Sequence, residues 1–379
     1  MRLFGGPAMM AAALLVALCG CSAGAPGDEA SGEPATAAPS AAPDPAANTP
    51  LTCAELVGGA DADTALASPS DLVDVAALLS SPRPSEFALA SVGGLHCAWR
   101  ADGSRGTYTN IGAPGVPWLE VEVLPGAADE WNSYTFGDAM GTAETTPYAG
   151  FEGAHSCGDP GCKATAAIGS AWVSIMVHDP GFGIGQSLVG STTDEIFAQL
   201  TPAATTLFSA VASATPAQLD WPTTPARAVD PRIEPCSSFL KTPALASALG
   251  VGTLDDYDPQ PDPDDPERVI YSIESVADRD AGFVHCYAEA GFDVRGSFTV
   301  ALDNAAIVDR LASGISPTSA LHLETLENLP ATETAVSDCD PAEPSSCQIW
   351  FSMGVDAIYV SRDTTDPKAV AEAIIAQAW

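Results

Sequence analysis

The clearest pattern of apolar and polar positions lies in Trp118–Leu124, where apolar and acidic residues alternate. Such an alternation places the apolar side chains on one face and predicts a half-buried strand. Leu95–Arg100 and Ala171–Val177, the latter rich in β-branched and aromatic residues, predict two further strands. A short turn at Cys157–Cys162, rich in Gly and Pro, precedes the last of these strands and favours antiparallel pairing.

Helical patterns separate these strands. Thr52 and Glu55 have the spacing of a capping box, which predicts a short helix from Cys53 onward. The other predicted helices of this part of the chain cover residues 70–81, 129–140 and 194–212, the last with an interruption near Pro202.

The second half of the chain repeats the first. Leu95-His96-Cys97-Ala98-Trp99 returns as Val284-His285-Cys286-Tyr287-Ala288, and four cysteines recur at offsets of 182 to 189 residues. We therefore predict an internal duplication of class α+β: two tandem copies of a disulfide-stapled antiparallel sheet with helices packed on one face. In the second copy we expect helices at 236–249, 305–313 and 368–379, strands at 285–287, 297–302 and 357–361, and a strand or short helix at 269–276.

The N-terminus carries an export signal. Arg2 precedes the apolar run Ala8–Leu18, which is too short to span a bilayer. Leu18-Cys19-Gly20-Cys21 resembles the bacterial lipobox, which implies that residues 1–20 are a signal peptide and that Cys21 is lipidated with diacylglyceryl and amide-linked acyl chains such as palmitate. A plain secretory peptide cut nearby is the alternative. The resemblance predicts a lipoprotein on the extracellular face of the cell membrane.

The domain organisation follows from composition. Residues 21–50 contain no aromatic residue and no Leu, Ile or Val, so we predict a disordered tether rich in Ala, Pro and Ser. The first α+β repeat then covers 51–215, a Pro-rich linker 216–234, and the second repeat 235–379.

The charge of the chain narrows its partners. It has 49 Asp and Glu against 14 Lys and Arg, a net charge of -35. This charge repels phosphate backbones, so nucleic acid is excluded as an expected partner. It suits a solvated extracellular monomer, or one that attracts cations or a basic protein. The alternative is that the acidity is common to all proteins of the source organism and indicates no partner.

Of ten cysteines, removal of Cys19 and lipidation of Cys21 leave eight in an oxidising compartment, which predicts four disulfides. A long bridge would tie the first helix of each repeat to its central strand, and a short bridge would close a turn. Zinc binding by each quartet and other pairings are the alternatives. The expected pairs are Cys53 with Cys97, Cys157 with Cys162, Cys236 with Cys286, and Cys339 with Cys347.

Few residues suggest chemistry. His96 and His285 are equivalent and should point away from the face of the neighbouring cysteine. They are either pH-sensing or metal-binding groups, or inherited residues at a domain surface. Ser238–Lys241 fits the S-x-x-K of penicillin-recognising enzymes without the companion motifs. The acidic loop 255–267 offers oxygen ligands to calcium but lacks the EF-hand glycine, so a solvated loop is the alternative.

None of these residues forms a complete catalytic or metal-binding motif, so we assign no catalytic residue, no metal ligand and no cofactor. Five tryptophans either line a ligand groove or belong to the core. They are Trp99, Trp118, Trp131, Trp172 and Trp350.

Two resemblances agree with an exported module. Pro235–Leu240 with Cys286-Tyr287, and Cys53–Leu56 with Cys97-Ala98-Trp99, resemble a family of actinobacterial lipoproteins of unknown function with a Cys-containing first helix and a Cys-aromatic strand. The chain is also similar to the extracellular sensor domains of mycobacterial serine/threonine kinases, which are α+β modules with two disulfides. It departs from both at the insertion 70–94. The resemblance implies a binding or sensing module and supplies no catalytic residues.

We therefore predict a membrane-anchored, non-enzymatic lipoprotein that binds a small ligand, an envelope component or another exported protein. An envelope hydrolase and a structural spacer are the alternatives. A pocket with clustered carboxylates would favour the hydrolase, an apolar or aromatic groove the binding module, and two convex domains the spacer.

Overall fold

The computed structural model describes residues 49–73, 82–101, 117–133, 145–158, 161–178, 191–223, 236, 242–254, 272–290, 293–315, 321–339 and 347–378. Several predictions fall outside these residues. They are the signal peptide, the lipidated Cys21, the tether up to residue 48, the S-x-x-K segment at 238–241 and the acidic loop 255–267.

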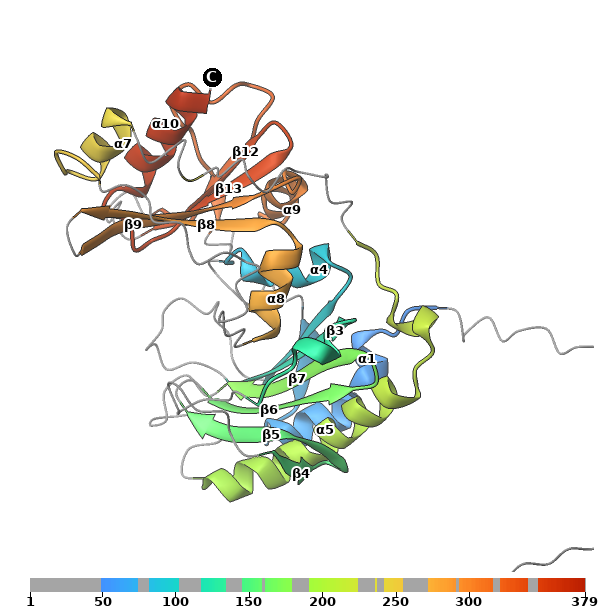
Figure 1. Cartoon of the computed structure of the whole chain (residues 1–379). Coiled ribbons are helices and arrows are strands. Elements are labelled where there is room, and N and C mark those ends of the chain that lie inside the picture. Colours follow the sequence, from blue (N-terminus) through green and yellow to red (C-terminus); the bar gives the residue numbers. More distant parts are fainter. Residues whose placement is uncertain are drawn as a thin grey trace, which may run out of the picture. The chain divides into compact units, whose positions relative to one another are not determined.

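The first repeat is built on an antiparallel sheet with the strand order β1-β2-β3-β7-β6-β5-β4 (Figure 1). Strand β3 is an inner strand, and its Val121 lies opposite Cys97 of β2 and Ile175 of β7. The strands are β1 (Ser70–Val73), β2 (Leu95–Ala101), β3 (Trp118–Pro125), β4 (Thr146–Tyr148), β5 (Phe151–Gly158), β6 (Gly161–Ile168) and β7 (Ala171–His178).

One face of this sheet packs on α1 (Cys53–Leu56), α2 (Gly59–Ala65) and α5 (Thr193–Ser213). Helix α1 begins at the predicted capping box, where the Thr52 N–H donates to the Glu55 carboxylate over 2.7 Å. By length and composition α5 is apolar enough to cross a membrane, but its apolar side chains are buried against the sheet. We therefore interpret α5 as a core helix.

Helix α5 runs through Pro202 without the predicted interruption. A proline inside a helix removes the hydrogen bond to the carbonyl four residues earlier, here that of Ala198. Leu200, Ala203 and Ala204 around it are fully buried. Packing of this face holds the helix together where local propensity opposes it.

The second repeat has its own antiparallel sheet, with the order β10-β11-β12-β13-β9-β8. Helices α7 (Pro243–Ala248) and α10 (Pro367–Ala378) pack on one face, and α8 (Ile273–Asp280) and α9 (Ala306–Ser313) contribute to a second core cluster. The predicted α+β class with two antiparallel sheets is confirmed. The strands are β8 (Phe283–Ala290), β9 (Asp293–Ala301), β10 (His322–Leu323), β11 (Ala335–Ser337), β12 (Ile349–Met353) and β13 (Asp356–Val360).

All four expected disulfides are present. Cys53–Cys97 and Cys236–Cys286 are equivalent bridges between the start of each repeat and its cysteine strand, β2 or β8. The short bridges Cys157–Cys162 and Cys339–Cys347 join cysteines that are 5 and 8 residues apart in the chain. The eight thiols are therefore oxidised, and none is available as a zinc ligand.

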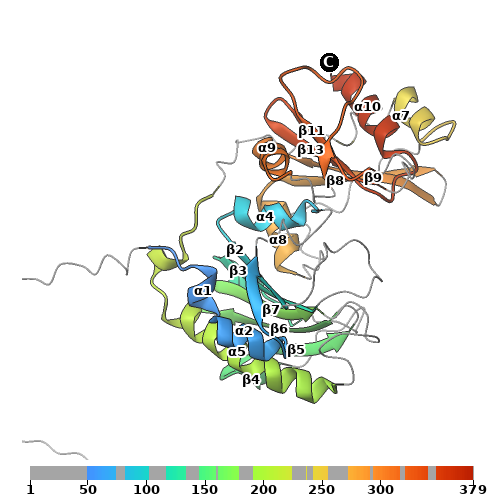
Figure 2. The same ribbon diagram turned by 180° about the vertical axis from the view of Figure 1, so that it is seen from behind.

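Helix α4 (Ser85–Ser91) precedes β2 as α8 precedes β8, so the two helices are equivalent. They pack on each other and lie side by side in both views (Figure 2). Their apolar residues share one core cluster, in which Phe87 of α4 meets Trp350 of β12 edge-on at 5.6 Å. The two repeats thus contact each other through an equivalent pair of helices.

Three predicted elements differ from the structure. Residues 70–73 form strand β1 and not a helix, because they pair with β2 and Asp63 accepts hydrogen bonds from the backbone and hydroxyl of Ser70. The described part of 129–140 holds only the 3-10 helix η2 (Ala128–Glu130). The predicted helix 236–249 is broken at Thr242, whose extended backbone caps α7. The segment 269–276, predicted as a strand or short helix, contributes to helix α8.

The start of the predicted linker packs on the first repeat. Residues Pro216–Leu219 form the 3-10 helix η3, and Trp221 is buried with its indole N–H donating to the Leu51 carbonyl over 2.7 Å. The ring of Trp221 therefore belongs to the hydrophobic core of the first repeat.

Candidate functional site

The face of the first sheet opposite α5 carries a layer of ionisable side chains. On β3, Glu120 and Glu122 are two residues apart and therefore share this face. Helix α4 packs against β2, and α8 packs against β3 and β7, so this face is covered. We call the following residues the polar layer: Glu86 of α4, His96 of β2, Glu120 and Glu122 of β3, Lys163 of β6, His178 of β7 and Glu274 of α8.

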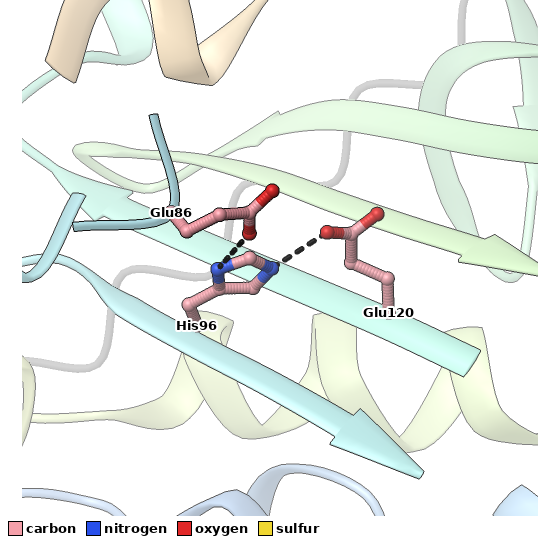
Figure 3. Close-up of side chains that lie close together, drawn as sticks. All are labelled: Glu86, His96 and Glu120. Carbon is pink, nitrogen blue, oxygen red and sulfur yellow. Dashed lines mark hydrogen bonds and ion pairs between the residues drawn. The ribbon is translucent and has the colours of Figure 1, made fainter. Parts of the chain in front are cut away.

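Within the polar layer, the imidazole of His96 lies between two carboxylates (Figure 3). Its Nε2 donates to Glu120 Oε1 over 2.6 Å, and its Nδ1 lies 3.7 Å from Glu86 Oε2. The other oxygen of Glu120 accepts a hydrogen bond from His178 Nε2. The ring of Trp118 stacks on His178 with centroids 3.8 Å apart, which fixes the imidazole plane.

These side chains are largely shielded from water. The exposed fraction is 8% for the side chain of His96, 12% for Glu120 and 18% for Glu86. His96 is therefore not exposed to solvent, because α4 covers the sheet face to which its side chain points. Its predicted direction, opposite to Cys97, is confirmed by the burial of Cys97 on the α5 side.

The environment shifts the pKa values of all three groups. Burial opposes protonation of His96, but the hydrogen bond and charge of Glu120, with the charge of Glu86, outweigh it and raise the pKa to about 10. Burial raises the pKa of Glu86 to about 7 against the attraction of His96. For Glu120, burial is outweighed by His178 and His96, which hold the pKa of the carboxyl well below its usual range.

A second group of the polar layer surrounds Lys163. Its Nζ lies 4.0 Å from Glu122 Oε2, and its pKa is raised because the charges of Glu274, Glu122 and Glu120 outweigh burial. Burial and the charge of Glu274 raise the pKa of Glu122 well above its ordinary value. Lys163 outweighs the burial of Glu274 and lowers the pKa of that carboxyl. One lysine thus lies among three buried carboxylates.

The equivalent histidine of the second repeat has different surroundings. His285 Nε2 lies 3.1 Å from Asp278 Oδ2 of α8, and its Nδ1 lies 2.9 Å from Thr299 Oγ1 of β9. Thr299 occupies the position opposite the histidine that Glu122 holds in the first repeat. The exposed fraction of the His285 side chain is 37%, against 8% for His96. Both repeats thus have a histidine at this position, but His285 has one neighbouring carboxylate, Asp278, where His96 lies between two.

Among the described residues, three metal-ligating side chains converge at Glu86, His96 and Glu120, whose donor atoms lie within 4.8 Å of one another. The sequence indicated only His96 of these. Glu120 lay in a predicted strand, but its alternation suggested a solvent-facing side chain. Trp99, Trp118, Trp172 and Trp350 are buried, which favours the core interpretation over a groove, and Trp131 packs partly buried against the shared cluster.

No protein-family model, curated protein or solved structure matches this chain. The resemblance to actinobacterial lipoproteins and to kinase sensor domains therefore stays a prediction.

Proposed function

We propose that the protein is an exported, lipid-anchored binding or sensing module without enzymatic activity, and that the polar layer of the first repeat holds its ligand. The leader with its lipobox-like Leu18–Cys21 supports export and anchoring. Four disulfides agree with an oxidising compartment. Two resemblances to exported modules support the same proposal.

The observation that carries the ligand site is the burial of charged groups on a sheet face. Replacing a buried ion pair by apolar residues is often neutral or stabilising, so such groups are weak devices for stability alone. Strongly shifted pKa values in a buried cluster are instead characteristic of functional sites. The Glu86, His96 and Glu120 group has this character, whereas the equivalent histidine of the second repeat, His285, is more exposed.

Native mass spectrometry of protein released from its host envelope tests the proposal. We expect wild-type protein to carry a bound species that Glu120→Gln protein lacks, because the amide keeps the volume and removes the charge. Identical mass spectra of the two proteins, with no bound species or partner in either, would contradict it.

One observation favours a second candidate, an envelope hydrolase. Glu86 and Glu120 have pKa values displaced in opposite directions, upward and downward. Pairs of carboxylates with separated pKa values serve as acid and nucleophile or base in glycoside hydrolysis. Release of soluble fragments from purified cell wall by wild-type protein, abolished by Glu86→Gln, would favour the hydrolase over the binding module.

A further inference from the structure

Three side chains of the polar layer, Glu86, His96 and Glu120, each place one possible donor atom within 4.8 Å of the other two. A tetrahedral zinc ion with ligand distances near 2.1 Å holds its ligand atoms about 3.4 Å apart. In this structure the two carboxylates face different nitrogens of His96: Glu120 Oε1 lies 2.6 Å from Nε2, and Glu86 Oε2 lies 3.7 Å from Nδ1. A rotation of the Glu86 or His96 side chain would therefore bring one imidazole nitrogen and two carboxylate oxygens around one ion.

We propose that Glu86, His96 and Glu120 bind one divalent transition-metal ion of the zinc class. This inference rests on the proposed function and names its ligand. A donor set of one imidazole nitrogen and two carboxylate oxygens matches zinc and its neighbours. The disulfides remove all eight thiols of the described chain from competition, so the site has no soft sulfur ligand.

One of the three proposed ligands, Glu120, is oriented by a hydrogen bond from a neighbouring side chain. Outer hydrogen bonds fix the orientation of a ligand and are part of a metal site. Here His178 Nε2 hydrogen-bonds the Glu120 oxygen that does not face His96, and Trp118 stacks on His178. His178 is a positioning residue for Glu120 in this arrangement.

The layer is rich in oxygen ligands for a cation. Four carboxylates, those of Glu86, Glu120, Glu122 and Glu274, share the layer with one lysine and two histidines. Within the described chain, Glu122 Oε1 and Glu274 Oε2 are buried without a hydrogen-bond partner. A divalent ion bound to carboxylates that are shielded from water would lower the cost of burying their ionised form.

Binding is a simple exchange. The ion takes the lone pair of one His96 nitrogen and replaces the proton on that atom, which leaves to solvent. The carboxylates of Glu86 and Glu120 each contribute one oxygen, and water completes the coordination. No oxidant or reductant is required.

The experiment uses the exported chain, stripped with a chelator and titrated with zinc chloride by calorimetry at neutral pH. We expect one ion per chain for wild-type protein, confirmed by elemental analysis after gel filtration. Glu120→Gln and His96→Gln should lose binding, and His178→Gln should weaken it by about 10- to 100-fold. Circular dichroism and a thiol assay show whether each variant is folded and oxidised.

His285→Gln is the matched control, because it removes the equivalent histidine in the repeat whose neighbours differ. It should bind zinc like wild-type protein. If Glu120→Gln fails to fold, Glu86→Gln gives the same test at the more exposed ligand. The inference is overturned if wild-type protein binds no zinc, if the ligand variants bind it unchanged, or if His285→Gln loses it equally.

Its failure is distinguishable from that of the proposed function. If stripped protein takes up no zinc, but native mass spectrometry finds an organic ligand on wild-type protein and not on Glu120→Gln, the metal inference falls and the binding module stands. If neither measurement detects a ligand, both fall.

Discussion

His96 shows how far a sequence predicts a single residue. The period of two along β2 places its side chain opposite Cys97, and this direction is confirmed. Its burial was not predictable, because the covering helix α4 is only 7 residues long and carries no side-chain cap. The burial of Glu122 was not predictable either. Its alternation with apolar neighbours predicts exposure, yet it is 2% exposed under packed helices.

The surroundings of Lys163 predict how its substitution changes the stability of the protein. Lys163→Met removes the cation among three buried carboxylates while keeping the volume, so we expect a loss of about 3–5 kcal/mol in the free energy of unfolding. Adding Glu274→Gln should recover part of that loss, because the unpaired charge disappears. Urea unfolding of the two variants measures both. Wild-type stability for Lys163→Met would contradict the charged arrangement.

The close packing at Gly161 predicts that a larger residue there destabilises the protein. A Cβ at this position would lie 2.1 Å from the Val177 carbonyl oxygen, so Gly161→Ala must push β6 and β7 apart. We expect a cost of about 1–3 kcal/mol. Gly59→Ala in α2 is the control: a Cβ there meets nothing within 4 Å, and helix propensity favours Ala by up to about 1 kcal/mol. Thermal melts should separate the two variants in opposite directions.

Elements were predictable where a local signal and the packing agree. The capping box of Thr52 and Glu55 starts α1, and the alternation in Trp118–Leu124 forms β3. They were not predictable where packing overrides the signal. Residues 70–73 join a sheet edge in spite of a helical pattern, and α5 continues through Pro202 because its buried face holds it.

The loop lengths of the disulfides predict how much each bridge contributes to stability. Cys53–Cys97 and Cys236–Cys286 close loops of 44 and 50 residues, and Cys157–Cys162 closes one of 5. Loop-closure entropy assigns about 4 kcal/mol to each long bridge and about 2 kcal/mol to the short one. Replacing each pair by Ala and measuring denaturant midpoints should reproduce this order. Equal losses for long and short bridges would contradict the entropic explanation.

At the scale of the molecule, the sequence indicated two similar halves but not how they contact each other. Residues 44–379 form one compact unit. The Pro82 carbonyl accepts hydrogen bonds from the side chains of Gln348 and Trp350, and Arg279 forms a two-armed ion pair with Glu130. These partners are more than 140 residues apart in the chain, and no local pattern encodes such contacts.

The shared core predicts cooperative unfolding of the two repeats. Calorimetry of wild-type protein should show one transition. Phe87→Ala removes the ring that packs on Trp350, so we expect a loss of about 3–5 kcal/mol and two separated transitions. Phe208→Ala, in the core of the first repeat alone, should lower stability without dividing the transition in this way. Two transitions in wild-type protein would contradict the coupling.

The most direct test of the account is a crystal structure of the protein purified from its host envelope, with diffraction recorded on both sides of the zinc absorption edge. We predict electron density for a bound species in contact with Glu86, His96 or Glu120, with an anomalous peak if that species is the metal. Direct hydrogen bonds between His96 and Glu120, with no density for a ligand anywhere in the polar layer, would contradict the claim that this layer is a binding site.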